Sequence, residues 1–459
     1  MFQYKPLAAA ILALVSIQAF ADDSLSTQTQ NGMENVAEVL QTAAPFSSAT
    51  QTQTGEGNNA FADQAGGNGT VTQTQNGEYN ASTGVQNTEA EGQVIHVQGG
   101  EWNNAHSEQW FGQNNNANVN QSGNANEAFS FQDSQLSSTV DIDQVDSANK
   151  ADVEQLFGQG NLTTINQGGL DNQAGTWQVD QTGSTLSIQQ SGEQNEAYVD
   201  QSLGIDNQVE VFQTGESGYV EVWQTEQESS QAVVEQGGGA LNELVVDQSF
   251  GSGNLATMTQ SGGANAAWAD QFESTDSIST VTQTGNGNLA LTYQQGENLN
   301  LTVTQNGNDN NIYASNWQGA QEGGQFGADQ IVELNQSGNG NTANFTQEGN
   351  FNELYFDQEG DNNALVVAQR DGANLAEGTS TGIGNSVEID QSGSDNLSRI
   401  TQSDGGDNFA SITQADMNNL SIITQSGWAN EATVSQSNMN MTSTIDQSGT
   451  GNVAIVAQQ

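Results

Sequence analysis

Residues 336–347 read QSGNGNTANFTQ, and the next two stretches, 347–358 (QEGNFNELYFDQ) and 358–369 (QEGDNNALVVAQ), follow the same pattern. Counted back from each closing glutamine, an asparagine lies six positions earlier, a small or apolar residue four earlier, and an aliphatic or aromatic residue two earlier. Alternation with period two is typical of a β-strand that turns one face inward. Each stretch therefore predicts one turn followed by one short strand.

The same glutamine returns almost every 11 or 12 residues from Gln30 to Gln458, giving 38 positions of which Ser380 alone is not glutamine. From Gln75 to Gln236 the steps alternate between 11 and 12, so the unit is 23 residues and holds two strands. From Gln414 to Gln458 every step is 11, and the unit becomes 22. Because a slip of one residue inside a strand would turn its inner face outward, the extra residues are expected in the turns.

Two strands joined by a turn rich in Gly, Asn, Ser and Asp form an arch whose inner faces meet. One arch buries too little to be stable, but stacking pairs its backbone with the coils above and below. The sequence thus predicts an all-β fold, a two-sheet β-solenoid of about 19 coils of 22–23 residues. At about 4.8 Å per coil the stack would be on the order of 90 Å tall, and its hand is left open.

Inward amides are costly when isolated, but they become favourable when an identical amide lies directly above and below to exchange hydrogen bonds. The predicted ladder residues are Gln336, Asn341, Ala343, Gln347, Asn352, Gln358, Asn363, Gln369, Gln391, Asn396, Gln402, Asn408, Gln414, Gln425, Asn430, Gln436, Gln447, Asn452 and Gln458. The glycines two positions after a ladder glutamine suit a turn that needs positive φ, and they are Gly338, Gly349, Gly360, Gly393, Gly427 and Gly449.

The regular repeat pattern is interrupted in two places. Steps of 13 and 18 separate Gln305, Gln318 and Gln336, which predicts an irregular long turn at 319–329. The first units are weakly patterned around residues 43–45. We therefore divide the chain into a signal peptide at 1–21, a weakly patterned N-terminal segment with the first coil at 22–45, and regular repeats at 46–459.

The N-terminal residues have the composition of a secretory signal. Lys5 precedes an apolar run from Leu7 to Val15, and Ala19-Phe20-Ala21 fits a small-x-small cleavage site. A membrane anchor is the alternative, but the run is too short to span a bilayer. The chain has no cysteine, so an exported protein of this sequence cannot depend on disulfides.

The net charge of −51 restricts the partners. After residue 21 only Lys150, Arg370 and Arg399 are fixed positive charges against 55 acids, which excludes nucleic acid as a partner. The acids fall on outward positions and in turns, where stacked carboxylates would repel by about 0.9 kcal/mol each in water. We expect diffuse, non-specific binding of cations, no cofactor, and faster self-association as salt is added. Low hydrophobicity with high charge suggests disorder, but the long register contradicts it.

The motif Gln-x-Gly-x-x-Asn-x-Ala-x-x-x-Gln, present at 336–347 and 447–458, resembles the curlin repeat of secreted curli fibre subunits. The resemblance implies an extracellular subunit that crosses the outer membrane through a secretion channel, nucleates on a minor subunit and polymerises into functional amyloid in a biofilm. This chain looks like an expanded member. It departs from the family in residues 22–28, DDSLSTQ, where no glycine-rich targeting stretch is evident.

No catalytic constellation is visible, and we expect no enzyme activity. His96 and His106 lie on neighbouring strands near acids, but alternation puts His96 inward and His106 outward, so two unrelated histidines are favoured over a metal site. Trp177, Trp223 and Trp317 precede ladder glutamines and so point outward, where they suit lateral fibre contacts or carbohydrate adhesion.

The rival function is that of a monomeric surface solenoid, either a carbohydrate-binding adhesin or an ice-binding protein. The outward pairs Thr257-x-Thr259, Thr280-x-Thr282 and Thr302-x-Thr304 fall on alternate strands, hence on one sheet. The strand preference of threonine also explains three such pairs. A polysaccharide-processing β-helix is disfavoured because no inward cluster of acids with basic partners is present.

Overall fold

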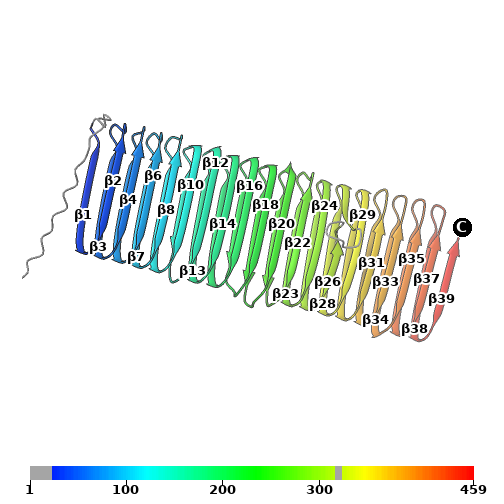
Figure 1. Cartoon of the computed structure of the whole chain (residues 1–459). Coiled ribbons are helices and arrows are strands. Elements are labelled where there is room, and N and C mark those ends of the chain that lie inside the picture. The colour runs from blue at the N-terminus through cyan, green and yellow to red at the C-terminus, as the bar shows by residue number, and fades with distance from the viewer. Residues whose placement is uncertain (1–22, 316–322) are drawn as a thin grey trace, which may run out of the picture.

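A computed structural model describes residues 23–315 and 323–459, and all regular structure within these ranges is β-strand. The strands stack into a straight, two-layered rod, with the N-terminal coil at one end and the C-terminal coil at the other (Figure 1). The described residues include no helix of the length and apolarity needed to cross a bilayer. The expected signal peptide, 1–21, lies outside the described residues.

The first sheet contains the strand that opens each coil. Its strands, in stacking order, are β1 (Leu25–Met33), β3 (Ser48–Glu56), β5 (Thr70–Glu78), β7 (Gln93–Glu101), β9 (Asn116–Asn124), β11 (Thr139–Gln144), β13 (Leu162–Leu170), β15 (Thr185–Glu193), β17 (Gln208–Gln213), β19 (Gln231–Gly237), β21 (Leu255–Ser261), β23 (Ile278–Asn286), β25 (Asn300–Asn308), β28 (Ile331–Asn339), β30 (Glu353–Asp361), β32 (Leu375–Ile383), β34 (Leu397–Gly406), β36 (Leu420–Trp428) and β38 (Thr442–Thr450).

The second sheet contains the strand that closes each coil. Its strands are β2 (Val36–Thr42), β4 (Asn59–Ala65), β6 (Ala81–Asn87), β8 (Asn104–Trp110), β10 (Glu127–Leu136), β12 (Lys150–Gln159), β14 (Gln173–Thr182), β16 (Glu196–Ile205), β18 (Tyr219–Glu228), β20 (Glu243–Ser252), β22 (Ala266–Phe272), β24 (Leu289–Glu297), β26 (Asn311–Ala314), β27 (Gly324–Ala328), β29 (Thr342–Asn350), β31 (Ala364–Gln369), β33 (Ser386–Gln391), β35 (Phe409–Gln414), β37 (Glu431–Gln436) and β39 (Val453–Gln458).

Every strand pairs in parallel with the equivalent strand of the next coil, with equivalent residues side by side. Gln30 of β1 is opposite Gln53 of β3, which is opposite Gln75 of β5. The second sheet repeats this arrangement from β2 to β39. The structure thus confirms the predicted two-sheet β-solenoid of about 19 coils.

Side chains alternate in and out along each strand, and the two inner faces form one narrow core. In β29 the inward residues Ala343, Phe345 and Gln347 are at most 2% exposed, while their neighbours point to solvent. Small alanines at one inward slot leave room for larger side chains at the next. The core is thin, so the inward amides make up a large part of it.

The irregularity near residue 319 is not a simple lengthened turn. β26 and β27 both pair with β24 on one side and β29 on the other, so they are two halves of one strand position. The extra residues therefore interrupt a strand, and residues 324–328 of the predicted turn are strand. Register survives because the chain leaves the sheet after Ala314 and rejoins it at Gly324. Residues 316–322, including Trp317 and Gln318, lie outside the described residues.

Candidate functional site: the amide ladders and the open ends

The ladder glutamines form one hydrogen-bonded column in each sheet. In the second sheet each Nε2 donates to the Oε1 of the next coil, as from Gln64 to Gln86 at 2.9 Å and from Gln436 to Gln458 at 2.8 Å. The first sheet has the same order, with Gln53 donating to Gln75 at 2.8 Å. Every link of both columns that is formed by two glutamines points from the N-terminal coil toward the C-terminal coil.

Most ladder glutamines also bond backbone carbonyls of their own arch. Besides bonding Gln98, Gln75 Nε2 donates to the backbone carbonyls of Asn80 at 2.9 Å and Asn59 at 3.0 Å. Both amide hydrogens are thus used, one along the stack and one across the turn. This explains how a 0–3% exposed amide is tolerated in the core.

The asparagines form a third column in the turn from the first sheet to the second, with the opposite polarity. Asn103 donates both its backbone N–H and its Nδ2 to Asn80 Oδ1, each at 3.0 Å. Asn126 bonds Asn103 in the same way at 3.1 and 3.2 Å. Hydrogen bonds from one asparagine to the next therefore point toward the N-terminus, and those from one glutamine to the next toward the C-terminus.

The predicted ladder residues all take inward positions in the structure. Gln336, Asn341, Ala343, Gln347, Asn352, Gln358, Asn363, Gln369, Gln391, Asn396, Gln402, Asn408, Gln414, Gln425, Asn430, Gln436 and Gln447 are at most 6% exposed. Asn452 and Gln458 belong to the last coil and are more exposed. Asn352 and Asn396 belong to a different asparagine column, in the turn from the second sheet to the first. That column is continuous only among the C-terminal coils.

The turn glycines occupy a tight approach between coils. Gly338, Gly349, Gly360, Gly393, Gly427 and Gly449 have φ between 94° and 115°. A Cβ on Gly338 would lie 2.0 Å from the carbonyl oxygen of Gly360, so only glycine fits this position. These glycines fall at the ends of strands, and the left-handed turn residue follows two positions later, as Gly340 or Phe351.

Two ladder positions differ from the others. Ser380 is buried and donates from Oγ to Gln402 Oε1 at 2.8 Å, so the column continues with a shorter side chain. In the interrupted coil the ladder residue is Gln325, which accepts from Gln294 at 2.8 Å and donates to Gln347 at 3.0 Å. The expectation that Gln318 holds this position was wrong, because spacing alone cannot choose between two glutamines inside an insertion.

Sequence reasoning missed an alternation in the turn from the second sheet to the first. Gln135 lies opposite Gly158 of the next coil, and Gln181 lies opposite Gly204. The long side chain enters the space that the glycine leaves: a Cβ on Gly158 would be 3.1 Å from Gln135 Oε1 and 2.4 Å from the carbonyl of Gln181. The structural repeat there is two coils. Its signal was present in the sequence as Gln and Gly alternating every 23 residues.

A second missed feature is the polar core of the first four coils. Gln28, Gln51 and Gln73 form an extra inward column, with Gln28 donating to Gln51 at 2.9 Å and Gln51 to Gln73 at 2.8 Å. His96 continues this column and is fully buried. From Val119 onward the same slot is almost entirely apolar.

His96 is held between serines of the second sheet. Its Nδ1 is 2.9 Å from Ser82 Oγ and its Nε2 is 2.8 Å from Ser107 Oγ. Burial, with His106 as a lesser cause, lowers the pKa of His96 to about 3. His106 lies on the outer face and bonds Glu108 at 2.7 Å. The histidines are therefore separate, and among the described residues no cluster of three or more metal-ligating side chains exists.

The outward residues of the two sheets differ in kind. Thr257, Thr280 and Thr302 lie side by side on the first sheet, as expected. A second threonine array occurs on β1, β3 and β5 of the same sheet. Trp177 and Trp223 lie on the outer face of the second sheet, where Trp177 is 46% exposed.

The two ends of the stack leave the ladders open. Gln447 and Gln458 each donate one Nε2 bond to a backbone carbonyl, and no described glutamine receives a second bond from either. Gln30 and Gln41 donate onward, but receive no amide from another described residue. The terminal strands also expose apolar side chains, with Ile455 of β39 71% exposed.

Comparison with protein families finds the Curlin associated repeat at residues 182–215 and 382–415, which is consistent with a curlin-repeat family member and confirms the resemblance. The two matches fall in the central and C-terminal parts of the stack. A comparison with curated proteins finds no match. The matches show curlin-type repeats in two separate parts of the solenoid.

Proposed function

We propose that this protein is a secreted subunit that polymerises head to tail into curli-type, amyloid-like fibres on the bacterial surface, supporting adhesion and the biofilm matrix. The observation that carries the proposal is the polarity of the ladders at the two ends. Free glutamine donors lie at the C-terminal coil and free glutamine acceptors at the N-terminal coil. A second copy of the chain supplies the missing partner at either end.

The register of such a contact follows from the repeat. Continuing the stack places β1 of one copy on β38 of another, and β2 on β39. Gln447 then donates to Gln30, and Gln458 donates to Gln41, as each ladder glutamine does to the next glutamine within the chain. An exposed strand edge is normally an aggregation liability, and here it is the working surface.

The other proposed partners follow from the curlin repeat and the charge. A minor subunit would nucleate the fibre, and an outer-membrane channel would secrete the chain after removal of residues 1–21. Non-specific cations would screen the outward carboxylates, so association should become faster as salt rises. The protein would need no cofactor, and nucleic acid would not bind.

The test compares two aspartate substitutions in the same outward slot. Ile455→Asp at the C-terminal edge would face Glu38 of an incoming copy, while Val366→Asp inside the stack faces Glu388 of its own chain. Val366 is 50% exposed, so the two sites are comparable. We expect Ile455→Asp to slow fibre elongation and Val366→Asp to leave it near that of the unmodified protein. Equal elongation rates, measured with seeded mature chain, would contradict end-to-end assembly.

A further inference from the structure

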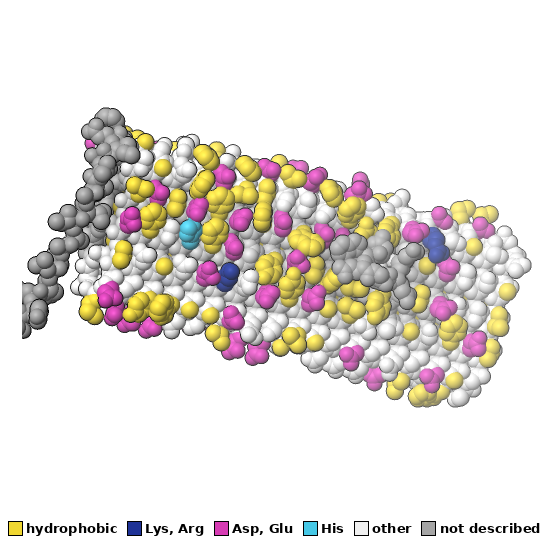
Figure 2. Space-filling view, viewed as in Figure 1, with side chains coloured by type: hydrophobic (Ala, Val, Ile, Leu, Met, Phe, Trp, Pro, Cys, Tyr) yellow, Lys and Arg dark blue, Asp and Glu magenta, His cyan; other side chains and the backbone are white. Residues whose placement is uncertain are grey.

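The outer face of the second sheet carries a line of aromatic rings and carboxylates along the axis of the stack. Strand pairing places Trp177 beside Asp200, and Asp200 beside Trp223. Because neighbouring strands are about 4.8 Å apart, the backbone positions of the two tryptophans are separated by about 9.6 Å. Apolar and acidic side chains interleave over this face of the molecule (Figure 2).

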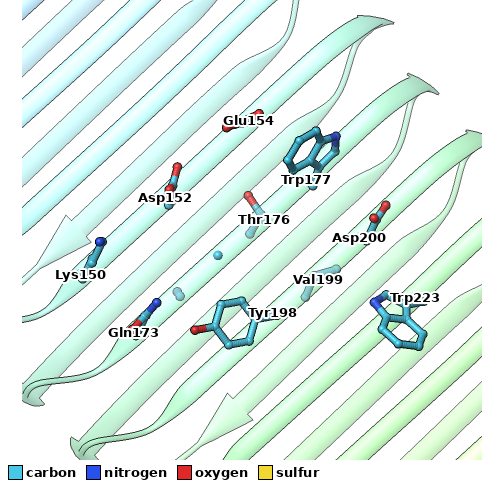
Figure 3. Close-up of a pocket in the computed structure, with 12 residues that line it drawn as sticks. Lys150, Asp152, Glu154, Gln173, Thr176, Trp177, Tyr198, Val199, Asp200 and Trp223 are labelled. Atoms are coloured by element: carbon cyan, nitrogen blue, oxygen red, sulfur yellow. The ribbon is translucent and has the colours of Figure 1, made fainter.

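A groove of about 280 Å³ opens beside Trp177 (Figure 3). Gly175 belongs to its lining and is paired with Asp152 of β12 on one side and Tyr198 of β16 on the other. A Cβ on Gly175 would lie 2.9 Å from the Tyr198 ring. Glycine therefore keeps this part of the groove open and lets the tyrosine ring lie close to the neighbouring strand.

The polar groups of the groove are only partly paired within the described protein, where Asp200 Oδ1 accepts a hydrogen bond from Ser202 Oγ. Asp152 Oδ1 is buried without a hydrogen-bond partner among the described residues. Burial also raises the pKa of Asp152. Lys150 and Gln173 lie at one end and can donate, while Glu154 and Asp200 can accept (Figure 3). A ligand that fits must present an apolar face together with hydroxyl groups that both donate and accept.

Charge narrows the choice of ligand. The groove holds Asp152, Glu154 and Asp200 against Lys150, in a chain of net charge −51. An acidic polymer would be repelled, and a second copy of the chain would bring the same carboxylates. A neutral sugar chain meets no such repulsion, and its hydroxyls can donate to the carboxylates that line the groove.

The spacing of the rings fits such a chain. In an extended β-linked hexose polymer one sugar is about as long as one strand spacing, and alternate sugars present the same face. We propose that this face binds a neutral β-linked polysaccharide along the axis of the solenoid, with alternate sugars stacked on Trp177 and Trp223 and the sugar between them bonded to Asp200. The inference does not depend on fibre assembly.

The test is a calorimetric titration of the full mature chain with cellohexaose. Trp177→Ala or Trp223→Ala should each weaken binding about tenfold, which corresponds to the loss of one ring contact. Trp428→Ala is the matched control, because Trp428 is 47% exposed at the end of β36 in the first sheet. Asp152→Asn keeps the shape of the groove and should also weaken binding.

Equal affinities for the Trp177 and Trp428 variants would overturn the proposal. So would binding that is confined to a cationic chitosan oligomer and lost at high salt, since that pattern would mean attraction to net charge alone. Circular dichroism of each variant checks that the solenoid is intact. Fibre formation by the tryptophan variants should be unchanged, which separates this test from that of assembly.

Discussion

The central coils and the C-terminal coils fill the same turn in different ways. From Asn352 to Asn419 the turn before each first-sheet strand holds asparagine, and Asn396 donates to Asn374 at 3.0 Å as Asn374 does to Asn352 at 3.2 Å. In the central coils that position alternates between asparagine and serine, as in Asn161 and Ser184. Side chains that stack at one turn position in neighbouring coils must therefore fit each other. Repeating the same residue is one way to achieve this fit.

Deletion of whole coils should show the largest difference between the central coils and the C-terminal coils. Removing residues 144–166 takes away Gly158 and stacks Gln135 directly against Gln181, so two long side chains compete for one space. Removing residues 144–189 takes two coils and restores Gln135 opposite Gly204. We expect the smaller deletion to be the less stable of the two, by about 1–3 kcal/mol from overpacking, as measured by denaturant unfolding.

The control is deletion of residues 425–446, one whole coil of the C-terminal region. There Thr424 would be followed by Gln447, and the asparagine column would run from Asn408 to Asn452. This protein should keep its β-structure and its assembly. If single-coil deletions in the two regions have equal effects, the two-coil repeat has no energetic consequence.

Substitution of a single glycine tests the same alternation of glutamine and glycine with a smaller change. Gly158→Ala should lower the free energy of unfolding by about 1–3 kcal/mol, because its Cβ would lie 2.4 Å from the Gln181 carbonyl oxygen and 2.6 Å from Asn161 Nδ2. Gly160→Asn is the control, since nothing lies within 4 Å of its Cβ and asparagine tolerates its φ of 65°. Similar thermal midpoints for the two variants would show that the alternating space is not tightly filled.

The polar core of the first coils predicts a loss of stability in acid. His96 has a pKa of about 3 when folded, against an ordinary pKa of 6.5, so between these pH values the unfolded chain binds the extra proton. Stability should therefore fall by about 1.4 kcal/mol per pH unit as pH drops below 6.5.

His96→Gln is the matched variant because it continues the column of Gln51 and Gln73. It should remove this part of the pH dependence when unfolding is followed from pH 7 to pH 4. An unchanged slope would mean that His96 is accessible to protons in the folded state.

The smallest effect concerns the one ladder position without glutamine. Ser380→Gln should restore the link from Gln358 to Gln402 and stabilise the protein by about 1 kcal/mol, the net contribution of one hydrogen bond. The melting temperature measures it, with Ser403→Gln, on the exposed side of the same sheet, as the neutral control. Destabilisation by Ser380→Gln would mean that the C-terminal coils have closed around the shorter side chain.

The sequence predicted the strands, their inward faces and the ladder residues, because one period governs all of them. It could not place the insertion, since Gln318 and Gln325 both satisfy a loose spacing and only pairing with Gln294 distinguishes them. The Gln135–Gly158 alternation was readable, but the shorter 23-residue period concealed it. The serines around His96 belong to the opposite sheet, so their contact depends on how the two sheets face each other.

Cross-linking across the proposed fibre contact tests the central claim, that open ladders join one copy to the next. In that contact Thr27 and Thr444 occupy the same outward slot on paired strands, about 4.8 Å apart, within the reach of a disulfide. Fibres of the Thr27→Cys/Thr444→Cys protein should oxidise to covalent multimers, whereas Thr27→Cys/Thr433→Cys, with its second thiol on the opposite sheet, should not. Equal cross-linking of the two proteins, or none in well-formed fibres of the first, would contradict the account.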